Sequence, residues 1–160
     1  MPSEPAAAST RTSRTIQAQP EALYRAFVDP DVLGDWLPPA EMTGVFHEFD
    51  ARVGGGYVMS LYYPPDEQTF RGKTGEREDR VRVRFLELAP PRRIVEAITF
   101  DSPDPSFHGE MRLTVTFEDA PGGTEVTMLF ENLPPGVRPE DNDEGARLSL
   151  DKLARRFESA

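Results

Sequence analysis

The sequence contains no cysteine and only two histidines among its 160 residues. The absence of cysteine excludes disulfide bonds, thiolate metal sites, thiol nucleophiles and redox relays. The two histidines, His47 and His108, lie on separate segments, and neither has an acidic residue at helical metal-ligand spacing. We therefore expect no metal site and no cofactor. A Gly-x-Ser-x-Gly nucleophile elbow is also absent, so the sequence does not predict a serine triad.

Long apolar runs and basic clusters are missing as well. No run approaches the length of a membrane-spanning helix, and the first ten residues, MPSEPAAAST, lack the features of a secretory signal. The 18 basic and 28 acidic residues give a formal charge of −10, which repels a phosphate backbone. We expect a soluble cytoplasmic protein that binds neither nucleic acid nor membrane. The length suits one domain, which we place at residues 11–160, after a disordered segment of residues 1–10.

The apolar pattern of the chain predicts the order of its elements. A first strand over Thr12–Ala18 precedes two short helices, which begin at Pro20 and Pro30 because proline is favoured in the first helical turn. About six alternating segments follow, and their short turns favour an antiparallel meander. The run Gly54-Gly55-Gly56 lies between two of these segments and opens no helix. It therefore predicts a hairpin turn and argues against a phosphate site.

Two of the alternating segments have irregular phases. Between Arg80 and Leu88, the apolar residues up to Phe85 keep one phase and those from Leu86 take the other. Such a switch indicates a bulge or a strong bend. Between Val45 and Asp50, aromatic residues occupy both alternating sets, so the inward face of that strand stays ambiguous.

The last segment, Glu140–Phe157, is the only long amphipathic helix that the sequence predicts. Its apolar stripe has a period of 3.6 residues and comprises Ala146, Leu150, Leu153, Ala154 and Phe157. A sheet that is covered by a single helix must curl around it. We therefore predict an α+β helix-grip fold, in which a curved antiparallel sheet of six to seven strands wraps around the C-terminal helix. Space left between the two layers would form a pocket.

Several segments in this order resemble the START-like superfamily of helix-grip proteins, also called SRPBCC. Within it, the chain resembles the branch named after the activator of the heat-shock ATPase chaperone. The resemblance spans nearly the whole chain after about Arg11 and is carried by TIQAQPEALYRAFVDPDVLGDWL, HEFDARVGGGYVMSL, DRVRVRFLELAPPRRIVEAITF, GEMRLTVTFEDAPGGTEVTMLFENLP and DNDEGARLSLDKLARRF. The chain departs from the branch after Gly145, where Ala146 stands in place of a frequent tryptophan. The smaller side chain either leaves room in the cavity or is repacked.

The predicted ligand site lies under the last helix. If the START-like fold is right, several aromatic residues line this space, although core packing explains most of them equally well. Glu110 would contribute a carboxylate if a bulge turned it inward, and Tyr57 would orient a ligand. The candidate ligand-binding residues are Trp36, Phe46, Tyr57, Met59, Tyr62, Phe70, Phe107, His108, Glu110 and Leu148.

The resemblance implies three classes of function, because this superfamily hosts ligand carriers, hormone receptors, enzymes and chaperone cofactors. The first is binding of a small hydrophobic or aromatic ligand without catalysis, which we favour. The second is an aromatase/cyclase-like enzyme for a polyketide-type substrate, which requires two titratable groups that face inward. The third is a cofactor of a heat-shock ATPase chaperone. Exposed strand edges leave a homodimer open as well.

Overall fold

The computed structural model describes residues 8–38, 42–62 and 78–158. These residues form one antiparallel sheet of seven strands in the order β1-β7-β6-β5-β4-β3-β2. The strands are β1 (Thr10–Ile16), β2 (Thr43–Phe49), β3 (Gly56–Tyr62), β4 (Glu78–Ala89), β5 (Arg93–Phe100), β6 (Met111–Ala120) and β7 (Gly123–Glu131). The helices are α1 (Pro20–Val28), α2 (Pro30–Trp36) and α3 (Pro139–Glu158), with a 3-10 turn η1 (Pro105–Phe107).

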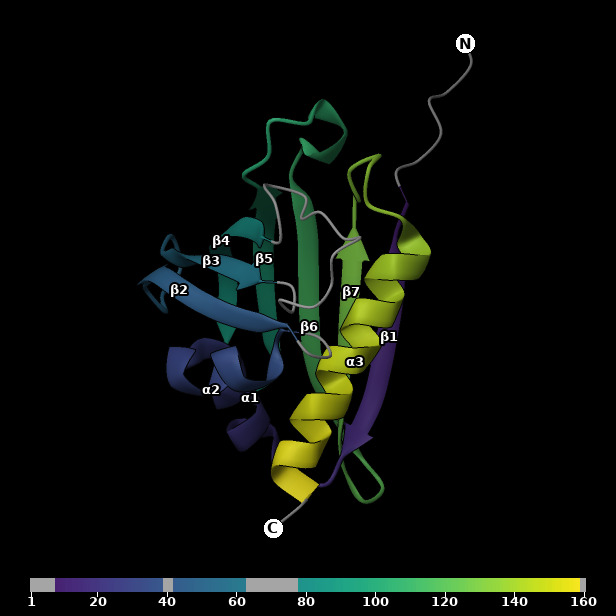
Figure 1. The fold of residues 1–160 in the computed structure, drawn as a ribbon. Helices are drawn as coiled ribbons and strands as arrows, with labels where there is room; N and C mark the ends of the chain where they lie inside the picture. Colours follow the sequence, from purple (N-terminus) through teal and green to yellow (C-terminus); the bar gives the residue numbers. More distant parts are fainter. Residues whose placement is uncertain (1–7, 39–41, 63–77, 159–160) are drawn as a thin grey trace.

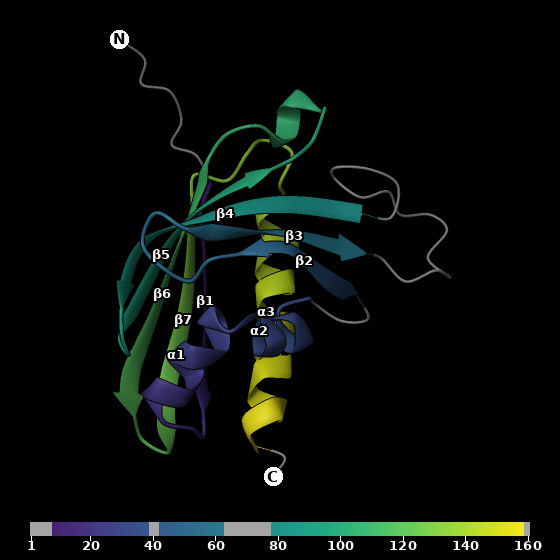
Figure 2. The same cartoon turned by 90° about the vertical axis from the view of Figure 1, so that its left-hand side faces the viewer.

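The sheet bends strongly, so that its two halves enclose the helices. In Figure 1, α3 crosses in front of β1 and β7, while α1 and α2 lie below β2. Figure 2 shows β5, β6 and β7 at the left and β4, β3 and β2 arching across the top, with α3 inside the bend. The predicted helix-grip α+β fold is therefore confirmed. The inner face of the sheet, which faces α3, holds most of the core.

The predicted element order is confirmed, with shifts of about two residues at the boundaries. The first strand begins at Thr10 and ends at Ile16, and β4 begins at Glu78. Both short helices begin at their predicted prolines, and Asp29 caps α2 by accepting a hydrogen bond from the backbone N–H of Asp31 at 3.0 Å. The predictions for residues 1–7 and for the segment around Phe70 lie outside the described residues.

A bulge explains each irregular strand. The register between β4 and β5 shifts between Phe85 and Glu87, which confirms the bulge predicted from the phase switch. The register between β2 and β3 shifts between Phe46 and Glu48. This second shift turns both Phe46 and Phe49 toward Tyr57, and so it resolves the ambiguous phase of β2.

The apolar stripe of α3 packs as predicted. Ala146, Leu150, Leu153 and Ala154 are buried, whereas Phe157 is half-buried. Polar contacts hold the flanks of the helix. On one side the Arg14 guanidinium of β1 pairs with Asp151, and on the other the Ser149 hydroxyl donates to the carbonyl of Leu37 at 2.6 Å. The closest backbone contacts of α3 are accordingly with β1 and α2, at its two flanks.

Candidate functional site

A carboxyl group lies in the middle of the inner face of the sheet. Glu96 of β5 stands opposite Phe85 of β4 and Leu113 of β6, and it shares a face with Ile94 and Ile98. Its exposed fraction is only 3%. No hydrogen bond or ion pair described for the structure involves this carboxyl, yet no fully enclosed side-chain N or O atom of the described residues lacks a hydrogen-bond partner. Buried acids are normally paired, so Glu96 is unusual for a core position.

Aromatic rings lie beside Glu96. Tyr57 of β3 is 6% exposed, and its ring stacks on Phe49 with centroids 5.1 Å apart. The Tyr57 ring also lies 6.0 Å from the ring of Phe85. Phe85 faces Glu96 across the strand pair, so these four residues are neighbours. We call Phe49, Tyr57, Phe85 and Glu96 the Glu96 cluster.

Burial decides the protonation of the Glu96 cluster. Removal from water raises the pKa of the Glu96 carboxyl to about 8, because the apolar surroundings penalise its charged form. Burial also raises the pKa of the Tyr57 phenol well above its ordinary value, and the charge of Glu96 adds to this rise. Near neutral pH, the interior therefore holds a protonated acid and a neutral phenol, both able to donate a hydrogen bond.

Glu96 was not among the predicted site residues, although the sequence carries a signal for it. Along β5 the residue shares the alternating phase of Ile94 and Ile98, both of which are buried. A charged residue in the inward phase of a strand departs from the polar-out pattern. The glutamate among the candidate ligand-binding residues was Glu110, on the condition that a bulge turned it inward. Its side chain is 51% exposed and lies 3.7 Å from the guanidinium of Arg84, so that condition is not met.

The structure places two of the predicted site residues deep in the core. Trp36 is fully buried, and its indole N–H donates to the carbonyl of Ala26 at 3.0 Å. Its ring packs edge-on against Phe27 with the ring centroids 4.6 Å apart, and the Phe27 ring packs edge-on against Phe117 with centroids 5.4 Å apart. Met59 is also fully buried. The packing alternative therefore accounts for both Trp36 and Met59.

The remaining candidates are spread over the molecule. Phe46 is half-buried and lies edge-on to Tyr57 at 5.4 Å, so it borders the Glu96 cluster. Tyr62 is 36% exposed at the end of β3, and Leu148 is half-buried on α3. Phe107 is half-buried against Phe100, whereas the exposed His108 bonds through Nε2 to the carbonyl of Ser102 at 2.7 Å. Phe70 lies outside the described residues. Of the predicted set, the structure thus brings Phe46 and Tyr57 to the Glu96 cluster.

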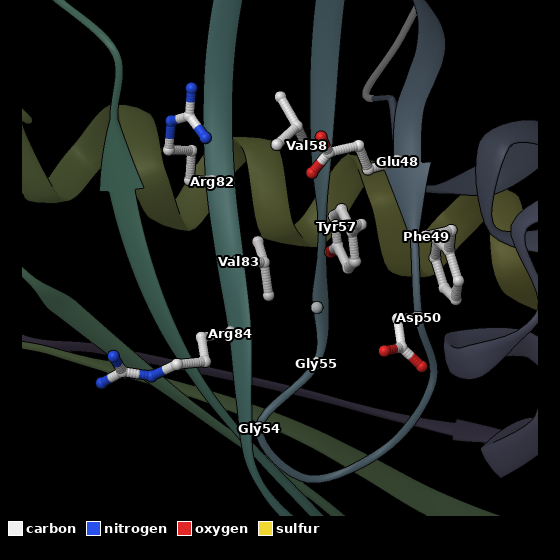
Figure 3. A pocket seen from close by; sticks show the side chains of 11 residues that line it. Glu48, Phe49, Asp50, Gly54, Gly55, Tyr57, Val58, Arg82, Val83 and Arg84 are labelled. Atoms are coloured by element: carbon white, nitrogen blue, oxygen red, sulfur yellow. The ribbon is translucent and has the colours of Figure 1, made fainter.

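A hollow of about 420 Å³ lies along β2, β3 and β4, and its lining includes Phe49 and Tyr57 of the Glu96 cluster together with residues of the outer face of the sheet. Figure 3 shows Arg82 and Arg84 of β4 on one rim, and Glu48 of β2 with Asp50 on the other. Both arginines already have acidic neighbours, because Arg82 lies 3.8 Å from Asp101 and Arg84 lies 3.7 Å from Glu110. Exposed pairs of this kind contribute little energy. The hollow is thus shallow, mixed in charge and partly neutralised.

Close backbone packing explains two of the three glycines that border this hollow, and a left-handed backbone conformation explains the third. A Cβ atom on Gly56 would lie 1.8 Å from the carbonyl oxygen of Val83, and one on Gly55 would lie 2.6 Å from the carbonyl oxygen of Asp50. Gly54 has a φ of +87°, in the left-handed region. The prediction of a hairpin turn is therefore confirmed. Their missing side chains also open the hollow.

The structure shows one polar contact that the sequence did not suggest. His47 is the extra residue of the β2 bulge, and its Nε2 lies 2.8 Å from the hydroxyl of Ser60. Arg80 lies 3.4 Å from the same ring nitrogen. Although this resembles a serine–histidine pair, Ser60 is fully buried and cannot reach a substrate. We therefore regard this contact as structural. Within the described ranges, no group of three His, Asp or Glu residues could hold a metal ion.

The fold and the comparisons define the class of this protein. An open sheet that bends around a C-terminal helix is the helix-grip form of an α+β protein. The sequence model described as "Activator of Hsp90 ATPase homolog 1-like protein" matches residues 17–158. The chain therefore belongs to this family, as the resemblance indicated. No helix in the described parts of the chain is long and apolar enough to cross a membrane.

Solved structures agree with this assignment. A protein from Chromobacterium violaceum is 33% identical, with a TM-score of 0.83 over 94% of this chain and 96% of that one. An AHSA1-like protein from Aeromonas hydrophila is 20% identical, with a TM-score of 0.70 over 95% and 93% of the two chains, and supports the fold alone. A Rhizobium loti protein is 26% identical, with a TM-score of 0.69 over 92% and 94%. No curated protein matches the sequence.

Proposed function

We propose that the protein binds a small hydrophobic or aromatic ligand between the inner face of the sheet and α3, beside the Glu96 cluster, and catalyses no reaction on it. The observation that carries this proposal is the buried carboxyl of Glu96 beside aromatic rings, whose pKa burial raises to about 8. A ligand that formed a hydrogen bond with this carboxyl would offset part of the free energy lost when the group left water. A few polar groups in an apolar interior are typical of small-molecule sites.

The position of α3 supports access to this region. The backbone of α3 comes closest to β1 and α2, while Glu96 lies on β5 in the middle of the sheet. Side chains therefore fill the distance between α3 and the central strands. One of them is Ala146, which is buried and small.

Native mass spectrometry of the purified protein tests this function, followed by a thermal-shift screen of apolar aromatics, lipids and polyketide-like compounds. A ligand that binds only the folded state must raise the melting temperature in a saturable way. Ala146→Trp should abolish the shift by filling the interior, and Arg147→Trp, on the exposed face of the same helix, should retain it. Absence of both a bound mass and a shift in the wild type would contradict the proposal.

An aromatase/cyclase-like enzyme is the second candidate, because such an enzyme needs two titratable groups that face inward. Tyr57 and Glu96 meet this requirement, and a carboxyl with a pKa of about 8 can act as a general acid near neutral pH. Incubation with poly-β-ketone thioester substrates, followed by product analysis by mass spectrometry, would distinguish this function. Turnover that Glu96→Gln abolishes would replace ligand binding by catalysis as our conclusion.

The family description also supports a role as cofactor of a heat-shock ATPase chaperone. That role would involve the acidic outer surface and would not require Glu96. Measuring the ATPase rate of a bacterial Hsp90 with and without the protein tests it. Stimulation that persists in Ala146→Trp would separate this role from binding in the interior.

A further inference from the structure

The charges buried in the described part of the protein are all acidic. Asp79 and Glu96 are 3% exposed each, and no described lysine, arginine or histidine is buried. Asp79 has a polar or charged partner. No hydrogen bond or ion pair described for the structure involves Glu96, and burial raises the pKa of its carboxyl to about 8. A buried carboxylate is stable only when it is paired. A cationic group on a bound ligand would supply such a partner.

The surroundings of Glu96 suit a cation that carries an apolar group. The rings of Tyr57 and Phe85 lie 6.0 Å apart next to the carboxyl, and Phe49 stacks on Tyr57. Aromatic faces attract ammonium groups through their quadrupole, most strongly where water is excluded. Phe85 and Leu113, the cross-strand neighbours of Glu96, provide apolar contacts for the rest of a ligand. The formal charge of −10 also attracts cations to the protein and repels anions.

We propose that the interior site is selective for a small hydrophobic cation, namely an aromatic ring that carries a protonated amine. The ammonium group donates a hydrogen bond to the Glu96 carboxylate, and the ring packs against Tyr57 and Phe85. This inference rests on the proposed function, because it assumes that a ligand binds between the sheet and α3. It goes further by specifying the charge of the ligand and the residue that recognises this charge.

Binding of such a cation must release a proton. In the free protein, burial raises the pKa of Glu96 to about 8, so the carboxyl is mostly protonated at neutral pH. An ammonium ligand stabilises the carboxylate and so expels about one proton per ligand at pH 7. A neutral ligand of the same shape accepts a hydrogen bond from the protonated carboxyl and releases none.

Few other groups on the inner face can contribute to this proton release. Tyr57 of β3 is neutral far above pH 7, because burial and the charge of Glu96 raise its pKa. Asp79 lies on β4 six positions before Phe85, and Tyr24 lies on α1 against Phe117. The inward residues of β6 and the buried residues of α3 are not titratable: Met111, Leu113, Val115, Phe117, Ala146, Ser149, Leu150, Leu153 and Ala154.

Isothermal titration calorimetry with three probes of similar shape tests the inference. The probes are 2-phenylethylamine, 2-phenylethanol and phenylacetate, which at pH 7 are a cation, a neutral molecule and an anion. Titrations in phosphate and in Tris report proton release, because the two buffers differ in ionisation enthalpy. We expect the amine to bind about tenfold more tightly than the alcohol, with release of about one proton. Phenylacetate should bind most weakly.

Glu96→Gln and a matched control complete the experiment. Glutamine keeps the shape and cannot ionise, so it should remove both the preference for the amine and the proton release. Glu118→Gln removes the same charge from an exposed position on β6 and should change neither. The proton count of the wild type remains a test even if Glu96→Gln folds poorly.

The outcomes separate this inference from the proposed function. Equal binding of the amine and the alcohol without proton release would overturn the inference and leave the binding site in place. Tightest binding of phenylacetate would overturn it too. If neither these probes nor the compounds of the thermal-shift screen bind, both the inference and the proposed function are wrong.

Discussion

Two aromatic regions of the interior differ in how their polar atoms are satisfied. Tyr24, Phe27, Trp36 and Phe117 form what we call the Trp36 cluster, between α1, α2 and β6. There the buried indole N–H of Trp36 has a carbonyl partner at 3.0 Å. In the Glu96 cluster, burial raises the pKa of both the carboxyl and the phenol. The first region satisfies its polar atom within the core, whereas the second holds a carboxyl whose charged form is disfavoured by burial.

Truncation in the Trp36 cluster should have the largest effect on stability. Trp36→Ala should lower the free energy of unfolding by about 5 kcal/mol, through cavity formation and the loss of the bond to Ala26. Chemical denaturation measures this loss. Phe157→Ala is the control, because the ring of Phe157 is half-buried and its removal should cost about 2 kcal/mol. Equal losses would show that Trp36 is not the centre of the packing.

The Glu96 cluster should make stability depend on pH. The folded state binds the Glu96 proton more tightly than the unfolded chain, since the pKa rises from 4.5 to about 8. Stability is therefore highest below the unfolded pKa, falls as the pH rises toward about 8, and is level above it. The decrease should be roughly 5 kcal/mol for the wild type. Denaturation series between pH 4.5 and about 8 should show that Glu96→Gln no longer depends on pH in this way. A variant whose stability falls with pH as the wild type does would contradict the role of Glu96.

The hairpin beside the Glu96 cluster should also resist substitution. Gly56→Ala should cost about 2 kcal/mol, because the new Cβ would collide with the carbonyl of Val83 and separate β3 from β4. The control is Gly145→Ala on α3, where a Cβ meets no atom within 4 Å. That change should stabilise the protein by roughly 0.5 kcal/mol through helix propensity. Thermal melts should show a lower melting temperature for Gly56→Ala and a higher one for Gly145→Ala than for the wild type. Lower melting temperatures in both variants would contradict the packing argument.

The smallest change in stability should come from the phenol of the Glu96 cluster. Tyr57→Phe should alter the free energy of unfolding by less than about 0.5 kcal/mol, because the hydroxyl forms no hydrogen bond with a described residue. The same variant should weaken ligand binding if the phenol orients the ligand. Denaturation and calorimetry on one preparation would test both statements. Unchanged affinity would remove Tyr57 from the site.

Some residues of the candidate site could be predicted and others could not. Aromatic residues on β2 and β3 pointed to Tyr57, which belongs to the Glu96 cluster, and to Phe46, which lies against Tyr57. Trp36 was equally suggestive in the sequence, yet it lies in the closed core because the turn between α1 and α2 brings it against Phe27. Glu110 and Glu96 differ in their position relative to the strands. A glutamate that precedes a strand keeps contact with water, whereas one in the inward phase cannot.

The sequence by itself determined the element order, the two proline-started helices, the β4 bulge and the apolar stripe of α3. Each depends on local geometry, in which side-chain period and backbone dihedral preferences act over a few residues. Only the tertiary structure decided which aromatic residues pack against each other and which acid loses its water. Those outcomes depend on strands distant in sequence, because Glu96 is isolated only when β4 and β6 place Phe85 and Leu113 on either side of it.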